Sequence, residues 1–228
     1  MTSIIYPVYW SYLMHAKFDK LPVDAIRDEF AQACAGSSRI ILSAPTGSGK
    51  STRIPCFLAD ILPPGAGAVI CVQPRRLAAR LLARRVAAER GVELGGEIGY
   101  RVRFDQRAGA TTKIIYETDG ILLREMRHDP QLRRASAIVF DEFHERRLAG
   151  DILLGLILDL QERLRPDLKI VVMSAGMDTE QLAEFLMPCK KIHAEGRTFP
   201  VDIRYHAPDH TRHAAPIRCQ SPASPRVW

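Results

Sequence analysis

Glycine, lysine and hydroxyl residues stand together in the stretch Ala44–Thr52, whose sequence is APTGSGKST. Gly47 and Gly49 would let the backbone curl so that several N–H groups point inward, and a helix beginning here would add partial positive charge. Lys50 would reach the β- and γ-phosphates of a nucleoside triphosphate, and the Ser51 hydroxyl would bind Mg²⁺. The stretch therefore predicts a phosphate-binding loop formed by Gly47, Ser48, Gly49, Lys50, Ser51 and Thr52.

The loop departs from the general pattern at its first position, where Ala44 stands in place of glycine. A glycine-rich turn with a chance lysine is the alternative interpretation. The apolar run Ile40–Leu42 before the loop and the helix expected over Thr52–Ile61 after it favour the phosphate-binding loop. That function requires a strand, a turn and a helix in this order.

Two adjacent carboxylates supply the chemistry expected beside a phosphate loop. Asp141 and Glu142 directly follow the apolar run Ala137–Phe140. Asp141 would hold Mg²⁺, often through a water molecule, and Glu142 would polarise the water that attacks the terminal phosphate. A solvated acidic turn is the alternative, but the upstream phosphate loop favours phosphoryl transfer to water. His144 follows the two carboxylates closely and suits a coupling role.

The elements that must position these residues alternate along the chain. Apolar runs predict strands, and segments of helical spacing or composition follow them. Such a chain forms right-handed β-α-β crossovers and a parallel sheet, and it binds ligands at the carboxyl ends of the strands. Because each chemical motif comes directly after a strand, we expect all of them on one rim. Strands are expected at 39–43, 68–72, 99–104, 113–116, 137–140, 168–173 and 201–205, and helices at about 22–30, 52–61, 77–90, 118–127, 151–163 and 179–186.

The composition is typical of a soluble globular protein with one large α/β domain or two small ones. Of 228 residues, 46% are hydrophobic and 25% are charged, so a full core can form. The net charge of +6 is compatible with nucleic-acid binding and equally with solvated arginines. Five cysteines without a CxxC pair indicate reduced, buried thiols in a cytosolic protein.

The sequence shows no sign of a membrane protein. No run is long and apolar enough to cross a bilayer. The segment Met1–Tyr12 is rich in aromatic residues, but it lacks the basic region and the small-residue cleavage site of a signal peptide. We therefore expect a cytoplasmic protein with no membrane partner.

The order of the motifs resembles a known family. The phosphate loop is followed by QPRR at 73–76, TDG at 118–120, DEFH at 141–144 and SAG at 174–176. This order is similar to the first RecA-like lobe of a DEAH-box helicase of superfamily 2. The residues around the motifs are closer still to the bacterial HrpB-type ATP-dependent helicases. The resemblance covers about 21–205 and implies an α/β fold, a RecA-like P-loop NTPase domain with a mainly parallel sheet flanked by helices.

The resemblance also implies contacts with nucleic acid and nucleotide. In the family, the loop that starts at Pro74 contacts the backbone of a single strand, and Arg76 is the stronger candidate there. Arg85 matches the position whose guanidinium stacks on adenine, and Arg84 is its neighbour. Such arginines suit sequence-independent phosphate contacts that weaken with salt, and a solvated helix face is the alternative for any one of them. The residues assigned to the strand are Pro74, Arg75, Arg76, Arg103, Thr118, Asp119 and Gly120.

The coupling motif departs from the family pattern. The family has Ser-Ala-Thr where this chain has Ser174, Ala175 and Gly176. The family threonine helps to link the hydrolytic site to strand movement. Gly176 removes that hydroxyl and loosens the backbone. We expect ATP binding to survive this change and coupling to unwinding to be impaired.

Both ends of the chain differ from the domain expected at 21–205. Residues 1–20 form an N-terminal extension that is rich in aromatic residues without periodicity, either a docking segment or the product of a misplaced start codon. Residues 206–228 are rich in proline, histidine and arginine, which predicts a disordered or aberrant tail. The histidines of this tail and Cys219 fit no standard zinc spacing.

A complete helicase of this type has a second RecA-like lobe that carries arginine fingers. This sequence contains no Gln-x-x-Gly-Arg-x-Gly-Arg motif. Arginine fingers supply transition-state charge worth several powers of ten in rate in related hydrolases. The expectation is therefore a truncated or frameshifted product of a longer gene, which alone would hydrolyse ATP slowly at best and would not translocate.

Two functions of different classes remain open. The first is the ATP-binding lobe of an RNA helicase, which binds Mg²⁺-ATP and single-stranded nucleic acid and hydrolyses ATP when paired with a second lobe. The second is a non-catalytic module that binds nucleotide or a partner. A small-molecule kinase is disfavoured because it does not account for QPRR, TDG and DEFH at successive strand ends. Nothing in the sequence separates RNA from DNA.

Overall fold

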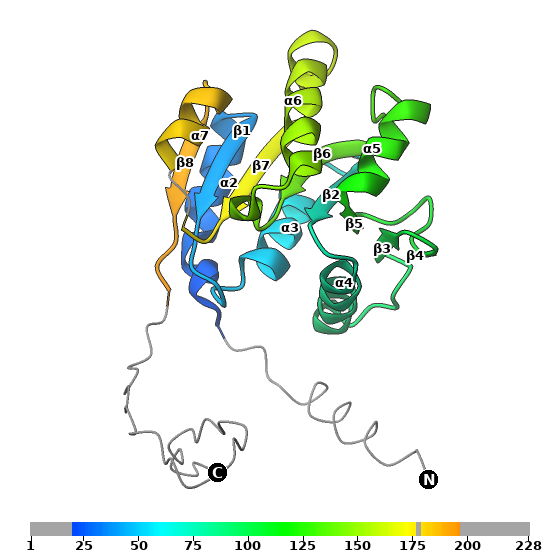
Figure 1. Cartoon of the computed structure of the whole chain (residues 1–228). Helices are drawn as coiled ribbons and strands as arrows, with labels where there is room; N and C mark the ends of the chain where they lie inside the picture. The colour runs from blue at the N-terminus through cyan, green and yellow to red at the C-terminus, as the bar shows by residue number, and fades with distance from the viewer. Residues whose placement is uncertain (1–19, 177–178, 197–228) are drawn as a thin grey trace, which may run out of the picture. The chain divides into compact units, whose positions relative to one another are not determined.

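Helices and strands alternate along the chain, as the apolar runs predict (Figure 1). The computed structural model describes residues 20–176 and 179–196. The predictions for residues 1–19, for a strand at 201–205 and for the tail at 206–228 lie outside the described residues, so they stay predictions. The described elements, in chain order, are η1 (Pro22–Ile26), α2 (Arg27–Gly36), β1 (Arg39–Ser43), α3 (Lys50–Ile61), β2 (Ala68–Gln73), α4 (Arg76–Arg90), β3 (Ile98–Val102), β4 (Asp105–Arg107), β5 (Ile114–Thr118), α5 (Asp119–His128), β6 (Ala135–Phe140), η2 (Phe143–Glu145), α6 (Leu148–Arg163), β7 (Lys169–Ser174), α7 (Thr179–Leu186) and β8 (Lys190–His193).

The described strands form one eight-stranded sheet in the order β4-β3-β5-β2-β6-β7-β1-β8. Every neighbouring pair is parallel except β3 with β4. The carboxyl ends of the parallel strands therefore meet along one rim. The phosphate loop, QPRR, TDG, DEFH and SAG follow β1, β2, β5, β6 and β7 on this rim, which confirms the predicted convergence.

Helices cover both faces of the sheet (Figure 1). Along β1, Ile40 and Leu42 pack in the apolar cluster that includes residues of α2, α3 and α4, while Ile41 packs in the cluster that includes residues of α5, α6 and α7. Successive side chains of a strand point to opposite faces, so a strand covered on both faces must be apolar throughout. This burial explains the continuous apolar runs in the sequence and confirms the α/β fold class.

The strand predicted at 99–104 is confirmed as far as Val102, but it ends two residues early, in a hairpin that was not predicted. β3 ends at Val102, Arg103 and Phe104 make the turn, and β4 returns antiparallel with Asp105 opposite Val102. Phe104 has a φ of 69°. The turn was missed because it contains no glycine or asparagine, the residues that usually mark a positive φ.

The edge strand β8 was also missed. It pairs in parallel with β1, and Ile192 is its one buried side chain. A strand at the edge of a sheet with a single apolar residue has no periodic signal. Helix boundaries shifted as well: α3 begins at Lys50 instead of Thr52, and α6 begins at Leu148 instead of Asp151. The earlier start of α3 places Lys50 and Ser51 in its first turn.

The cysteines in the described part of the chain are free thiols, as predicted. Cys34, Cys56 and Cys71 are buried, and Cys189 is partly exposed. Burial raises the pKa of the Cys34 thiol to about 11 and raises the pKa of Cys71 well above its ordinary value. These thiols therefore stay protonated and unreactive at neutral pH.

A buried carboxyl lies near the carboxyl end of β5, at Glu117. Its side chain is fully buried, and neither carboxylate oxygen has a hydrogen-bond partner in the described part of the chain. Burial raises the pKa of Glu117 well above its usual range, and the nearby Glu125 raises it further. Arg101 opposes this shift, but its Nη1 lies 4.0 Å from Glu117 Oε2 and also pairs with Glu125.

Glu117→Leu is expected to stabilise the fold by about 1–3 kcal/mol at neutral pH, because it removes a buried carboxyl that lacks hydrogen-bond partners in the described part of the chain. The native-state pKa is raised, so the contribution of Glu117 to stability is fully present below its unfolded pKa of about 4.3 and is lost as pH rises. The advantage of the leucine should therefore grow with pH. Urea unfolding at several pH values measures it. The control is Glu29→Leu on an exposed face of α2, and an advantage for Glu117→Leu that is the same at every pH would contradict the argument.

Candidate nucleotide and nucleic-acid site

The phosphate loop is fixed by two glycines and by the segment before α2. Gly47 and Gly49 have φ values of 81° and 91°, a region that favours glycine. A Cβ at Gly49 would lie 2.5 Å from Leu21 Cδ1. The N–H of Val23 donates to the carbonyl of Ser48 at 3.1 Å, so η1 holds the loop from outside. Leu21 and Val23, which precede α2, therefore lie against the loop and restrict its conformation.

Ala44 behaves as an extension of β1, which explains how alanine replaces the usual glycine. Its N–H donates to the carbonyl of Ser174 at 3.0 Å and so continues the pairing of β1 with β7. Its side chain is 1% exposed and belongs to the apolar cluster on the α3 face. The methyl group therefore packs in the core, away from the open side of the loop.

Lys50 and Glu142 form the ion pair at the centre of the rim. Lys50 Nζ lies 3.1 Å from Glu142 Oε1, with side-chain exposures of 3% and 26%. Glu142 has a φ of 50°, which is unusual for a residue with a side chain and costs of order 1–3 kcal/mol. A non-glycine residue in this conformation beside a buried lysine is the kind of local strain found at functional sites.

Asp141 is buried beside Glu142 and is oriented by three donors. Gln73 Nε2 donates to its Oδ2 at 2.7 Å, the N–H of Glu142 donates to its Oδ1 at 2.9 Å, and the Ser51 hydroxyl also bonds to the carboxyl. Burial raises the pKa of Asp141, and the hydrogen bonds from Ser51 and Gln73 lower it. Gln73, the last residue of β2, was not predicted as a site residue.

A hydroxyl and a carboxylate in contact suit a hard cation such as Mg²⁺, which is usually held by one or two carboxylates, water and phosphate oxygens. Ser51 and Asp141 supply this pair of oxygens. No group of three or more His, Cys, Asp and Glu side chains with metal-binding geometry exists among the described residues. Ser51 and Asp141 fit the protein side of a Mg²⁺ site whose other ligands would be water and phosphate oxygens.

His144 connects the carboxylates to the coupling motif. Its Nε2 lies 3.3 Å from Glu142 Oε2, and its Nδ1 accepts a hydrogen bond of 3.4 Å from the N–H of Ala175. An acceptor Nδ1 leaves the ring proton on Nε2, where it faces Glu142. Ser174 and Gly176 adjoin this contact, because the N–H of Gly176 lies 3.5 Å from Ser174 Oγ. The predicted coupling residues thus touch the predicted catalytic ones.

The residues predicted to bind a strand lie along the same rim but not in one cluster. Arg75 is exposed and pairs with Glu145 at 2.9 Å. Asp119 is nearly buried at the start of α5, where its Oδ1 accepts from the N–H of Gly120 at 2.7 Å. Arg103 lies further along the rim, in the hairpin turn after β3, with its guanidinium carbon 4.6 Å from the centroid of the Phe104 ring. Pro74, Arg76 and Thr118 complete the set at the ends of β2 and β5.

Arg85 lies on α4, next to the helix that starts in the phosphate loop. It pairs with Glu89, which also accepts from Arg53 of α3 at 3.1 Å. Arg84 is exposed and forms no ion pair with any residue in 20–176 or 179–196. This geometry places Arg85 on the side of α4 that faces α3. The assignment of Arg85 to adenine stays a prediction.

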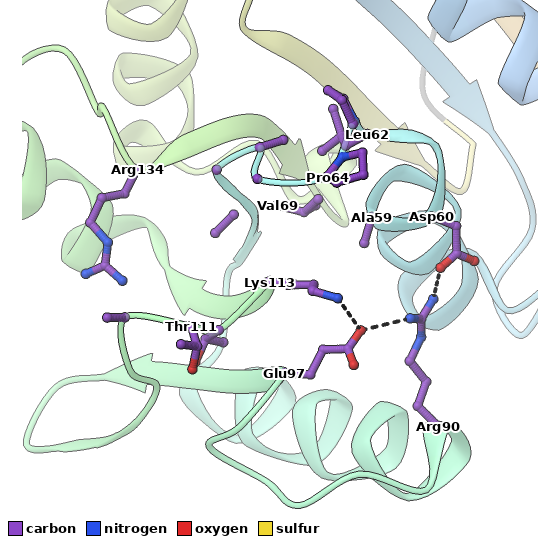
Figure 2. A pocket seen from close by; sticks show the side chains of 17 residues that line it. Ala59, Asp60, Leu62, Pro64, Val69, Arg90, Glu97, Thr111, Lys113 and Arg134 are labelled. Atoms are coloured by element: carbon purple, nitrogen blue, oxygen red, sulfur yellow. Dashed lines mark hydrogen bonds and ion pairs between the residues drawn. The ribbon is translucent and has the colours of Figure 1, made fainter.

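A separate hollow of about 690 Å³ lies at the amino ends of β2, β5 and β6, opposite to the carboxyl rim (Figure 2). Its charged groups are largely paired with one another: Arg90 contacts Asp60 at 2.5 Å and Glu97 at 3.1 Å, and Lys113 lies 3.6 Å from Glu97. None of the residues predicted to bind nucleotide or strand lines this hollow. The predicted chemistry is therefore confined to the carboxyl rim.

A parallel sheet with a phosphate loop after β1 and paired carboxylates after β6 defines a RecA-like P-loop domain. The model of the DEAD/DEAH box helicase family matches residues 25–185, and the chain belongs to this family.

Two further comparisons agree. The chain is 42% identical over 186 residues to the ATP-dependent RNA helicase HrpB of Escherichia coli, covering 81% of this chain and 23% of the relative. Crystal structures of the E. coli DEAH/RHA helicase HrpB and of the E. coli DExH-box NTPase HrpB match with TM-scores of 0.76 and 0.74, both at 42% identity. The two matches cover 85% and 84% of this chain, and 25% and 24% of the respective HrpB chains. The chain thus spans about a quarter of the length of these relatives.

Within the described residues, no helix has the length and apolar character needed to cross a membrane.

Proposed function

We propose that this chain is the ATP-binding lobe of an ATP-dependent RNA helicase of the cytoplasm, and that it binds Mg²⁺-ATP and single-stranded RNA. The observation that carries the proposal is the cluster of Lys50, Ser51, Asp141 and Glu142, in which two distant strand ends meet within hydrogen-bond distance. The family membership and the name of the E. coli relative support the same function.

In this proposal each residue of the cluster has a defined role. The N–H groups of Gly47–Thr52 and the ammonium group of Lys50 bind the phosphates. Ser51 and Asp141 hold Mg²⁺, which would neutralise phosphate charge and polarise the γ-phosphoryl group. Glu142 orients the attacking water and takes up its proton when nucleotide draws Lys50 away. His144 holds the Glu142 carboxylate from the other side.

Single-stranded RNA binds across the rim through arginines that read no bases. Arg75, Arg76 and Arg103 offer exposed guanidinium groups for phosphates, and the turn at Thr118–Gly120 offers a helix N-terminus. Such contacts are independent of sequence and weaken as salt rises. RNA is preferred over DNA in this proposal because the E. coli relative is named as an RNA helicase.

Full hydrolysis and unwinding require a second lobe in this proposal. The relatives are about four times as long as the matched region. In related hydrolases an arginine from another element stabilises the transition state. The competing function is a nucleotide-binding module without turnover, and Gly176 favours it, because this residue offers no hydroxyl for coupling.

Lys50→Ala should weaken the binding of a fluorescent ATP analogue by about 10–100-fold, because a charge-assisted hydrogen bond to phosphate contributes about 1.5–3 kcal/mol. The control is Lys113→Ala, which removes a lysine at the opposite edge of the sheet. Fluorescence titration in the presence of Mg²⁺ measures both, and circular dichroism checks their folding. Equal affinities for the two variants would rule out the phosphate loop as the nucleotide site.

Glu142→Gln distinguishes the enzyme from the binding module. It keeps the size of the side chain but removes the charge that orients water, so hydrolysis should fall by about 10²–10⁴-fold while nucleotide affinity stays within a few-fold. Phosphate release is measured with and without single-stranded RNA, on this chain and on a version extended with a second lobe. Strand-stimulated release that Glu142→Gln abolishes supports the enzyme. Binding without any stimulated release, even in the extended version, supports the module.

A further inference from the structure

The segment that follows Asp141 and Glu142 contacts both loops that are proposed to bind single-stranded RNA. Arg147 donates from Nη1 to the carbonyl of Pro74, and its Nε lies 3.8 Å from Asp119 Oδ2. Two residues earlier, Glu145 Oε1 accepts from Arg75 Nη2 at 2.9 Å. One short segment therefore contacts the ends of β2 and β5.

The order of the strands in the sheet shows how far this segment extends across the rim. β6, which delivers the carboxylates, neighbours β2, and β2 neighbours β5. Arg147 lies in the chain after the end of β6. Its side chain reaches past the end of β2 to the start of α5. Arg146 has a φ of 45°, so the chain turns sharply just before Arg147, which is the N-terminal cap residue of α6. A small hollow lined by Pro74, Asp119, Asp141, Glu142 and Arg147, among others, marks where these elements meet.

Arginine is suited to such a bridge. The planar guanidinium carries five donors in fixed directions, so it can serve a carbonyl and a carboxylate at once. Asp119 is already oriented, because its other oxygen accepts from the N–H of Gly120. The Arg75–Glu145 pair is the more exposed of the two links, with the Arg75 side chain 72% exposed, and a strand phosphate can compete with Glu145 for Arg75. The Arg147 side chain is less exposed, at 46%, and it contacts two different loops where Arg75 contacts one carboxylate.

We propose that Arg147 is a positioning residue that couples the strand-binding loops to the nucleotide site. It holds the loop at Pro74 and the turn at Asp119 against the segment that carries Asp141 and Glu142. Single-stranded RNA that binds these loops therefore favours one arrangement of the carboxylates. Bound nucleotide favours the same arrangement of the loops. The inference rests on the proposed function, since it requires that both ligands bind.

Coupling between two sites is reciprocal and is measured as a ratio of affinities. The experiment titrates the full chain with a fluorescent, non-hydrolysable ATP analogue and Mg²⁺, with and without a saturating short oligouridine. For the wild-type chain, the dissociation constants of the analogue with and without oligouridine should differ by about 5-fold or more, within the usual range of allosteric coupling. Arg147→Ala should bring the ratio close to 1 and leave the affinity for the analogue alone within about 2-fold, because Arg147 lies outside the phosphate loop.

Two variants make the test specific. Arg147→Lys keeps the charge near Asp119 but lacks the planar fork, so it should restore part of the coupling. Arg163→Ala removes an arginine from the other end of α6, where it pairs with Asp159 at the surface, and it should leave the ratio unchanged. Thermal unfolding checks that each variant is folded. If Arg147→Ala does not fold, Arg147→Gln is judged by the same ratio.

The outcomes separate this inference from the proposed function. A coupling ratio that Arg147→Ala leaves at the wild-type value overturns the inference, and so does an equal loss in Arg163→Ala. A wild-type chain that binds both ligands with a ratio of 1 overturns the inference and leaves the proposed function standing. A wild-type chain that binds neither ligand overturns the proposed function and this inference with it.

Discussion

The ion pair between Lys50 and Glu142 is the interaction on which the rest of the site depends. A lysine with 3% of its side chain exposed is costly to bury unless a carboxylate lies beside it. That carboxylate comes from a strand end more than ninety residues further along the chain. The pair forms because β1 and β6 are separated only by β7 and run in the same direction. The parallel sheet thus brings the phosphate loop and the acidic motif together.

Other contacts spread from this pair along the rim. Gln73 at the end of β2 orients Asp141, His144 connects Glu142 to Ala175 after β7, and Arg147 reaches Asp119 at the start of α5. The site is therefore a row of strand ends connected through side chains, and the two apolar layers beneath it fix the spacing of the strands. A conformational change at one strand end has direct physical contacts through which it can affect the next.

The sequence predicted the residues that follow strand ends better than it predicted their partners. The phosphate loop and the Asp141–Glu142 pair were found because apolar runs directly precede them, and the parallel sheet requires such ends to share one rim. β8 and the turn at Arg103 and Phe104 were missed, since neither carries a periodic or glycine signal. Gln73 and Arg147 were missed for a different reason. Their roles rest on contacts between residues far apart in the chain, and spacing in sequence does not encode those distances.

The central claim is that the rim binds nucleotide by drawing Lys50 from Glu142 to phosphate. A crystal structure of the chain with Mg²⁺ and a non-hydrolysable ATP analogue tests this claim most directly. The claim predicts the β- and γ-phosphates against the N–H groups of Gly47–Thr52, with Lys50 Nζ on phosphate oxygen and the metal near Ser51 and Asp141. An analogue bound in the hollow at the opposite edge of the sheet, with the Lys50–Glu142 pair still intact at 3.1 Å, would contradict it.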